Sequence, residues 1–182
     1  EGADIYYTTD GTEPTAQSAK YETPFIWDTK GTVKAITCDP QSGKTGPVGM
    51  RYFDLPATDY KVVSPVDDRT SLLFDGNGYS TYYLPEGKNE LAIELAEPHV
   101  IKGFVYTPNQ GRDASGHISN YQLLVDGKIV ASGEFSNIKN NPIEQEIHFN
   151  PVKGQKLIFK ATRIVDNAKR VGIAEFSVIT ED

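Results

Sequence analysis

The sequence contains very few of the residues that build covalent cross-links or soft metal sites. Its 182 residues include one cysteine, one methionine, one tryptophan and three histidines. The single Cys38 excludes an internal disulfide and leaves a metal–thiolate site without partner ligands. His99 and His148 have no partner at the spacing of metal ligands, so we expect both to be surface residues.

Long hydrophobic runs and an excess of positive charge are also absent. No run of eighteen apolar residues occurs, so no segment is predicted to insert into or span a membrane. The net charge is −7, and neither residues 1–56 nor the remainder is basic. Binding to a phosphate backbone or to an anionic membrane surface needs a positive patch, so the composition argues against nucleic-acid and membrane-surface partners.

Catalytic signatures are missing as well. The Gly-x-Ser-x-Gly motif that positions a serine nucleophile does not occur. A glycosidase pair needs two carboxylates facing each other across a cleft, whereas the acidic residues here lie mostly on predicted turns or polar strand faces. We therefore expect no catalytic site in this chain, and a binding role instead.

What the sequence does contain is a succession of short strand patterns divided by turn residues. In the first part, the aromatic and β-branched segments 4–9, 32–37 and 48–53 alternate with loops rich in Gly and Pro. Asp-Gly at 10–11 predicts a tight turn after the first of them. No window shows helical periodicity over ten residues, so residues 1–54 are predicted to form a small β-sandwich.

Strand patterns resume after a short proline-bearing linker at 55–59. Eight or so strands follow at spacings of about ten residues, among them 90–95 and 100–106, and Asp126-Gly127 predicts a hairpin. This spacing predicts a β-sandwich of jelly-roll type over residues 60–182. The fold class is therefore all-β, with two β-sandwiches in succession. Because the chain starts abruptly with Glu-Gly-Ala-Asp, we expect it to be an internal or C-terminal piece of a longer protein.

Oxygen-bearing side chains gather on one glycine-rich loop within 72–83. Asp75, Asn77 and Thr81 supply a carboxylate, an amide and a hydroxyl, and calcium prefers six to eight oxygen ligands. A second carboxylate, Glu175, stands in an apolar run near the C-terminus, and we predict that the two stretches meet. From the residues alone an alternative stays open, in which Asp75-Gly76 is an ordinary turn and Glu175 faces solvent.

The first part of the chain carries a family resemblance. The string Ile5-Tyr-Tyr-Thr-Thr-Asp-Gly-Thr-Glu-Pro-Thr15, with Ser18, Tyr21, Pro24-Phe25 and Val33-Lys-Ala-Ile36, resembles the immunoglobulin-like domain appended to chitobiases and β-hexosaminidases. The same domain is attached to several bacterial fucosidases. The resemblance implies an immunoglobulin-like spacer between modules over residues 1–54, with the first strands of such a domain missing.

The second part resembles another family. The motifs that carry this resemblance follow one another in register, and they are Asp75-Gly-Asn77, Thr81, Ile93-x-Leu95, Gly103-Phe-x-Tyr106-x-Pro108, Gly116-x-Ile118-x-x-Tyr121, Asp126-Gly127 and Ala174-Glu-Phe176. Together they are similar to the coagulation factor V/VIII type C (discoidin) domain, in the branch of family 32 carbohydrate-binding modules. The resemblance implies a structural calcium ion whose ligands would be Leu72, Asp75, Asn77, Thr81, Ala174 and Glu175.

A sugar site needs an aromatic face for stacking and a few planar polar groups for the hydroxyls. Loop residues supply both, and the candidates are Tyr79, Tyr82, Asn109, Arg112, Asp113, His117, Asn137 and Asn141. The sequence departs from the family where an arginine often follows the proline, because Asn109 stands there. It departs again at Tyr83, where the family often has tryptophan.

We therefore expect a non-catalytic, carbohydrate-binding accessory region of a bacterial glycoside hydrolase, related to chitobiases, hexosaminidases or fucosidases. The expected location is periplasmic, cell-surface or secreted. The expected partners are the parent's own catalytic domain and glycans containing galactose, N-acetylhexosamine or fucose. Two alternatives stay open. In one, both modules pack against the catalytic domain without binding sugar; in the other, the second is a protein-adhesion domain.

Overall fold

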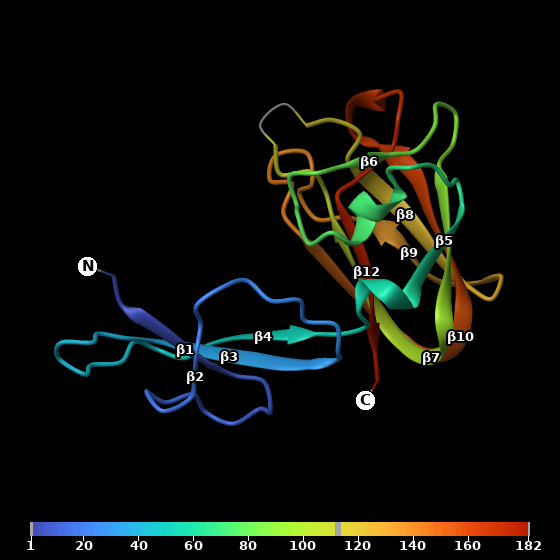
Figure 1. Ribbon diagram of the computed structural model, residues 1–182. Helices are drawn as coiled ribbons and strands as arrows, with labels where there is room; N and C mark the ends of the chain where they lie inside the picture. Colours follow the sequence, from blue (N-terminus) through green and yellow to red (C-terminus); the bar gives the residue numbers. More distant parts are fainter. Residues whose placement is uncertain (1, 112–113, 182) are drawn as a thin grey trace. The chain divides into compact units, whose positions relative to one another are not determined.

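The computed structural model describes residues 2–111 and 114–181. Its regular structure is β-strand apart from three short 3-10 helices, η1 (Ala57–Asp59), η2 (Thr70–Phe74) and η3 (Val165–Asn167) (Figure 1). No helix in these described ranges has the length and hydrophobicity that a membrane crossing requires. The all-β prediction is confirmed. The chain divides into two compact units, Glu1–Pro56 and Ala57–Asp182, and this division falls inside the predicted linker.

The first unit is built around one antiparallel sheet with the strand order β2-β1-β3-β4. Its strands are β1 (Asp4–Thr8), β2 (Ala19–Lys20), β3 (Gly31–Cys38) and β4 (Gly49–Phe53). β3 pairs with a neighbour on each side, and its side chains Ile36 and Cys38 are the buried apolar residues of this sheet. The β-branched pattern predicted at 32–37 therefore marks an inner strand of the sheet.

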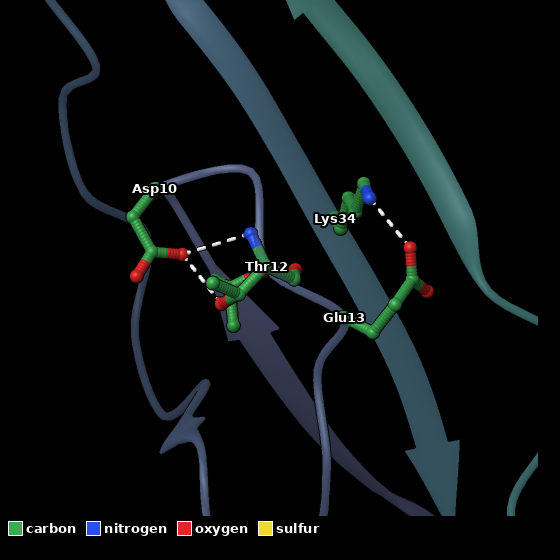
Figure 2. Close-up of polar contacts among 5 residues, drawn as sticks. Asp10, Thr12, Glu13 and Lys34 are labelled. Carbon is green, nitrogen blue, oxygen red and sulfur yellow. Dashed lines mark hydrogen bonds and ion pairs between the residues drawn. The ribbon is translucent and has the colours of Figure 1, made fainter.

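The Asp-Gly turn after β1 is closed by the side chain of Asp10 (Figure 2). Its Oδ1 accepts hydrogen bonds from the backbone N–H of Thr12 at 3.0 Å and from the Thr12 hydroxyl at 2.6 Å. These bonds lower the pKa of Asp10. Gly11 has φ +82°, a conformation that glycine adopts without strain. Glu13 then pairs with Lys34 at 2.5 Å, which ties the loop to β3 (Figure 2).

The second unit holds the larger sheet, with the order β12-β7-β10-β8-β9 and with β5 also paired to β7. A two-stranded sheet of β6 and β11 accompanies it. The strands are β5 (Tyr60–Ser64), β6 (Tyr82–Tyr83), β7 (Glu90–Thr107), β8 (Ile118–Val125), β9 (Lys128–Glu134), β10 (Gln145–Ile164), β11 (Gly172–Ile173) and β12 (Glu175–Thr180).

Two long strands connect the layers of this unit. The predicted strands 90–95 and 100–106 form the single strand β7, whose first half pairs with β5 and whose second half pairs with β12. β10 follows β7 along its whole length, with register shifts between His148 and Val152 and between Gly154 and Lys156. These irregularities bend the pair, so the sheet folds over and packs against itself.

An aromatic cluster fills the space between the layers. Phe104 on β7 is fully buried, and its ring centroid lies 5.3–6.3 Å from those of Tyr121, Phe135, Phe159 and Phe176. These rings come from β8, from the segment after β9, from β10 and from β12. The core therefore holds all the long strands together at one point.

Tyr106 adds a polar connection to this core. Its buried hydroxyl accepts a hydrogen bond from the backbone N–H of Ile118 and donates one to the carbonyl of Gly172, each at 3.1 Å. Burial raises the pKa of the hydroxyl far above its usual value, so the group stays neutral. These two bonds join the start of β8 to the start of β11.

The variant Tyr106→Phe is expected to lower the free energy of unfolding by about 1–3 kcal/mol, because it leaves a buried N–H and a buried carbonyl without a partner. Urea unfolding followed by tyrosine fluorescence or circular dichroism would measure the loss. Tyr79→Phe serves as the control, since Tyr79 is 74% exposed and an exposed hydroxyl contributes less than about 0.5 kcal/mol. Equal urea midpoints for the Tyr106 and Tyr79 variants would contradict the stabilising role of the Tyr106 hydroxyl.

Candidate functional site

The loop after η2 is closed by its own polar side chains. Asp75 accepts hydrogen bonds from the backbone N–H of Asn77 on Oδ1 and from the Ser80 hydroxyl on Oδ2, both at 2.8 Å. The side-chain oxygen of Asn77 accepts a bond from the N–H of Tyr79 at 3.1 Å. Gly76 has φ +73°, which allows the sharp turn. The sequence therefore folds here into a hydrogen-bonded Asx-type loop.

Glu175 reaches this loop from the other end of the chain. It is the first residue of β12 and lies opposite Thr107 in the register with β7. Its Oε1 accepts a hydrogen bond of 3.0 Å from the N–H of Asn77, which also bonds Asp75. The stretch around 72–83 and the stretch around 174–175 thus meet at one backbone N–H.

The two carboxyl groups form an electrostatically unfavourable pair. Burial, together with the neighbouring Asp75, raises the pKa of Glu175 to about 8. Within the described part of the chain neither carboxylate has an ion pair with a basic side chain. Two converging carboxylates without a basic partner supply the negative charge and the oxygen ligands that a divalent, oxygen-seeking cation requires. Asp75 and Glu175 therefore fit the calcium ion that the resemblance implies.

The other predicted ligands lie on the same two stretches of the chain and differ in burial and in hydrogen bonding. Ala174 is fully buried directly before Glu175, and Leu72 lies in η2. Thr81 is buried, its hydroxyl accepts a hydrogen bond from the side-chain amide of Asn109, and its carbonyl accepts one from Arg69 at 3.4 Å. Both oxygens of Thr81 are thus engaged within the protein. The Ser80 hydroxyl, which the sequence analysis did not single out, is the one that contacts Asp75.

The structure brings two of the sugar-site candidates together. Tyr79 is 74% exposed, and its carbonyl accepts a hydrogen bond of 3.3 Å from the side-chain amide of Asn109. The N–H of Gln110 donates to the carbonyl of Gly78 at 2.8 Å. The loops 75–80 and 108–111 therefore form one continuous surface that displays an aromatic ring.

Two further candidates are buried. Tyr82 is 1% exposed and its hydroxyl donates to the carbonyl of Pro65 at 3.4 Å, so its ring offers no face to a ligand. His117 is 8% exposed, and burial lowers its pKa, with the Asn109 backbone acting in the opposite direction. It therefore stays neutral at physiological pH. Arg112 and Asp113 lie outside the described residues.

The remaining candidates, Asn137 and Asn141, belong to a neighbouring loop. The N–H of Asn141 donates to the carbonyl of Asn137 at 2.9 Å, which closes a turn between them. The side-chain amide of Gln110 bonds the carbonyls of Pro108 and Pro142, each at 2.6 Å. Gln110 therefore links this loop to the surface that carries Tyr79 and Asn109.

Arg170 is a prominent side chain that the sequence analysis missed. Its Nε donates to the carbonyl of Leu84 at 3.0 Å, and its Nη2 donates to that of Tyr83 at 2.9 Å. The guanidinium carbon lies 5.4 Å from the centroid of the Tyr83 ring. No local pattern could have indicated this contact, because the partners are separated by most of the second unit in sequence.

Comparison with known proteins begins with the first unit. Residues 1–49 match the family model of the chitobiase/beta-hexosaminidase C-terminal domain. This match confirms the resemblance that was based on the string from Ile5 to Thr15. No curated protein sequence matches the chain.

Solved structures share the fold over about seven-tenths of the chain, the proportion that the second unit occupies. A Clostridium perfringens module named CBM32-5, solved with GalNAc-β-1,3-galactose, is 21% identical, with TM-score 0.57, covering 69% of this chain and 98% of the module. The family 32 module of C. perfringens NanJ, solved with galactose, is 18% identical, with TM-score 0.57, covering 68% of this chain and 95% of the module.

A third structure connects the two resemblances. The C-terminal domain of a Bacteroides fragilis chitobiase is 18% identical, with TM-score 0.55, covering 70% of this chain and 97% of that domain. At these identities the likeness establishes the fold, which is the jelly roll of the family 32 modules. The predicted discoidin-type sandwich is therefore confirmed.

Proposed function

We propose that the chain is a non-catalytic accessory region of a secreted, cell-surface or periplasmic bacterial glycoside hydrolase, and that its second unit binds glycans. The first unit supports this proposal through its match to a domain of chitobiases and hexosaminidases. The second unit supports it because similar modules were solved with galactose and with GalNAc-β-1,3-galactose. The domains that the chain resembles are accessory rather than catalytic, in agreement with the absence of catalytic motifs from the sequence.

The observation that carries the binding role is the surface formed by Tyr79 and Asn109. An exposed ring on a loop held by hydrogen bonds can stack against the C–H face of a sugar at little entropic cost. The loop at 137–142 adjoins this surface through the bond from Gln110 to the carbonyl of Pro142. Galactose, N-acetylhexosamine and fucosylated glycans are the ligands we propose for this surface.

In the parent enzyme, such a module would hold the catalytic domain close to its substrate. Binding of one module makes the encounter of the other intramolecular, which raises the effective concentration of the catalytic domain at the glycan. The first unit would act as the spacer between the two.

The calcium ion belongs to this proposal as a stabilising element. Asp75 and Glu175 would hold it with their carboxylates, and the ion would neutralise their combined charge. Asn77, the Ser80 hydroxyl and the carbonyls of the same loop could supply further oxygen ligands. Because β12 and the loop 75–80 are far apart in sequence, the ion would fasten the end of the chain to the loop that carries Tyr79.

The variant Tyr79→Ala is expected to weaken glycan binding by about tenfold, since an exposed aromatic anchor contributes more than about 1 kcal/mol to such a contact. Calorimetry with galactose, N-acetylhexosamines and fucosylated oligosaccharides would measure it. Tyr79→Phe keeps the stacking face and should retain the affinity. Absence of binding to every one of these glycans at millimolar concentration would rule out the proposed function and favour a purely structural role.

A further inference from the structure

A pocket of about 310 Å³ opens where β8 begins and β9 and β10 end. Its polar rim includes Glu134, Asn137, Arg163 and Asp166. Of the sugar-site candidates among the described residues, Asn137 alone lines it, so the pocket is distinct from the surface formed by Tyr79 and Asn109. Its size is at the lower end of the range for small-molecule sites and suits a single sugar unit.

Two of the residues that line this pocket, Arg163 and Glu134, carry opposite charges and share a row of the sheet. Arg163 on β10 and Glu134 on β9 both lie opposite Asn120 on β8, so the three residues form a row across three neighbouring strands. The backbones of Arg163 and Glu134 are therefore two strand spacings apart, at about 4.8 Å for each spacing. Neither side chain has a hydrogen bond or ion pair with any other residue that the structure describes. A guanidinium and a carboxylate that line the pocket are thus both available to a ligand.

Turn conformations and an ion pair shape the loops around the pocket. Asn137, Asp166 and Asn167 adopt left-handed backbone conformations, with φ of 50°, 54° and 53°. Lys139 pairs with Asp166 at 2.5 Å, which joins the loop after β9 to η3. A binding surface ordered in advance loses less entropy when a ligand arrives.

The residues that line the pocket determine which class of ligand it can bind. The rim carries two acidic and two basic side chains, so it has no net charge to attract an anion or a cation. Phe135 and Ile138, 2% and 4% exposed, supply an apolar floor. Neighbouring hydroxyls can accept hydrogen bonds from Arg163 and donate them to Glu134, which neither an apolar molecule nor a simple ion can do.

We propose that this pocket is a second saccharide site, which takes one neutral, hydroxyl-rich hexose unit. The inference shares only the class of ligand with the function proposed above, because it does not require that the surface of Tyr79 and Asn109 bind sugar. If both sites bind, one module can hold two units of a branched glycan, and its avidity exceeds the affinity of either site.

Nuclear magnetic resonance titrations of the whole chain would test this site. Neutral hexoses and N-acetylhexosamines are the probes, with glucuronate as the charged comparison. At least one neutral sugar is expected to shift the amide signals of Asn137, Asp166 and Asn167. Arg163→Ala and Glu134→Gln should each weaken that binding by about tenfold or more, because a hydrogen bond to a charged group is lost.

Two control variants separate this site from other effects. Lys153→Ala removes an exposed cation from β10 outside the pocket and should leave the titration unchanged. Tyr79→Ala should also leave these shifts unchanged, even if it abolishes binding at the other surface. The proposal would be overturned if no neutral sugar moved these signals, if glucuronate bound more tightly than every neutral sugar, or if the Arg163 and Glu134 variants bound normally.

Discussion

Calcium is expected to raise the free energy of unfolding of the second unit by about 2.7 kcal/mol when its concentration is a hundred times the dissociation constant. The gain arises because the ion would bind the folded state, in which Asp75 and Glu175 meet at the N–H of Asn77, and not the unfolded chain. Thermal or urea unfolding in calcium and in a chelator would give the difference. Magnesium should stabilise less, because it requires a tighter octahedral site.

The variant Glu175→Gln should remove most of this gain, since it replaces one of the two charged ligands with a neutral amide of the same shape. Glu86→Gln, an exposed loop residue, provides a control for the loss of one negative charge. A calcium-dependent increase of the same size in both variants would show that the ion binds elsewhere.

The pair of Asp75 and Glu175 should also make the stability of the calcium-free protein depend on pH. The pKa of Glu175 is about 8 in the folded state against an ordinary value of 4.5, so between these values the folded state binds more protons than the unfolded state. Stability should therefore fall as pH rises from about 4.5 to about 8. Calcium competes with the proton, so saturating calcium should flatten this decline. A decline that Glu175→Gln leaves unaltered would have to come from another group.

The second large effect concerns the aromatic core. Phe104→Ala should lower the free energy of unfolding of the second unit by about 3–5 kcal/mol, because it leaves a cavity among four packed rings. Chemical unfolding monitored by circular dichroism would measure the loss. Phe104→Leu, which keeps most of the volume, should retain a folded protein if the alanine variant does not fold.

An exposed residue gives the comparison for this core variant. Ile129 on β9 is 58% exposed, so Ile129→Ala should change the free energy by less than about 0.5 kcal/mol. If Phe104→Ala cost no more than Ile129→Ala, the ring cluster would not be the centre of the fold.

Much of the fold could be predicted because its signals are local. The alternating segment 90–95 places Leu91, Ile93 and Leu95 on the buried face, as its period of two requires. Asp126-Gly127 forms the tight turn between β8 and β9, with φ of 47° and 79°, so the predicted hairpin is confirmed. Both features depend only on neighbouring residues.

Contacts between distant segments were harder to anticipate. The union of 90–95 with 100–106 into one strand depends on pairing with β10 along both segments, which no local pattern specifies. The row formed by Arg163, Asn120 and Glu134 depends in the same way on the register of three strands. The approach of Glu175 to Asp75 was predicted from ligand chemistry and resemblance, whereas the bond from Ser80 to Asp75 was not.

The middle of β7 has a mechanical consequence. The second unit's first strand begins opposite Leu95 and its last strand ends opposite Ile101, so both ends of the unit attach near the bend of β7. The loop that carries Tyr79 lies at the other end of β12, where Glu175 pairs with Thr107. In the proposed arrangement the first unit precedes β5 and would connect the module to the enzyme, so tension between the enzyme and a bound glycan would act first on the pairing of Tyr60 with Leu95. The carboxylate pair, held at the far end of β12, would lie away from the point where this force enters the module.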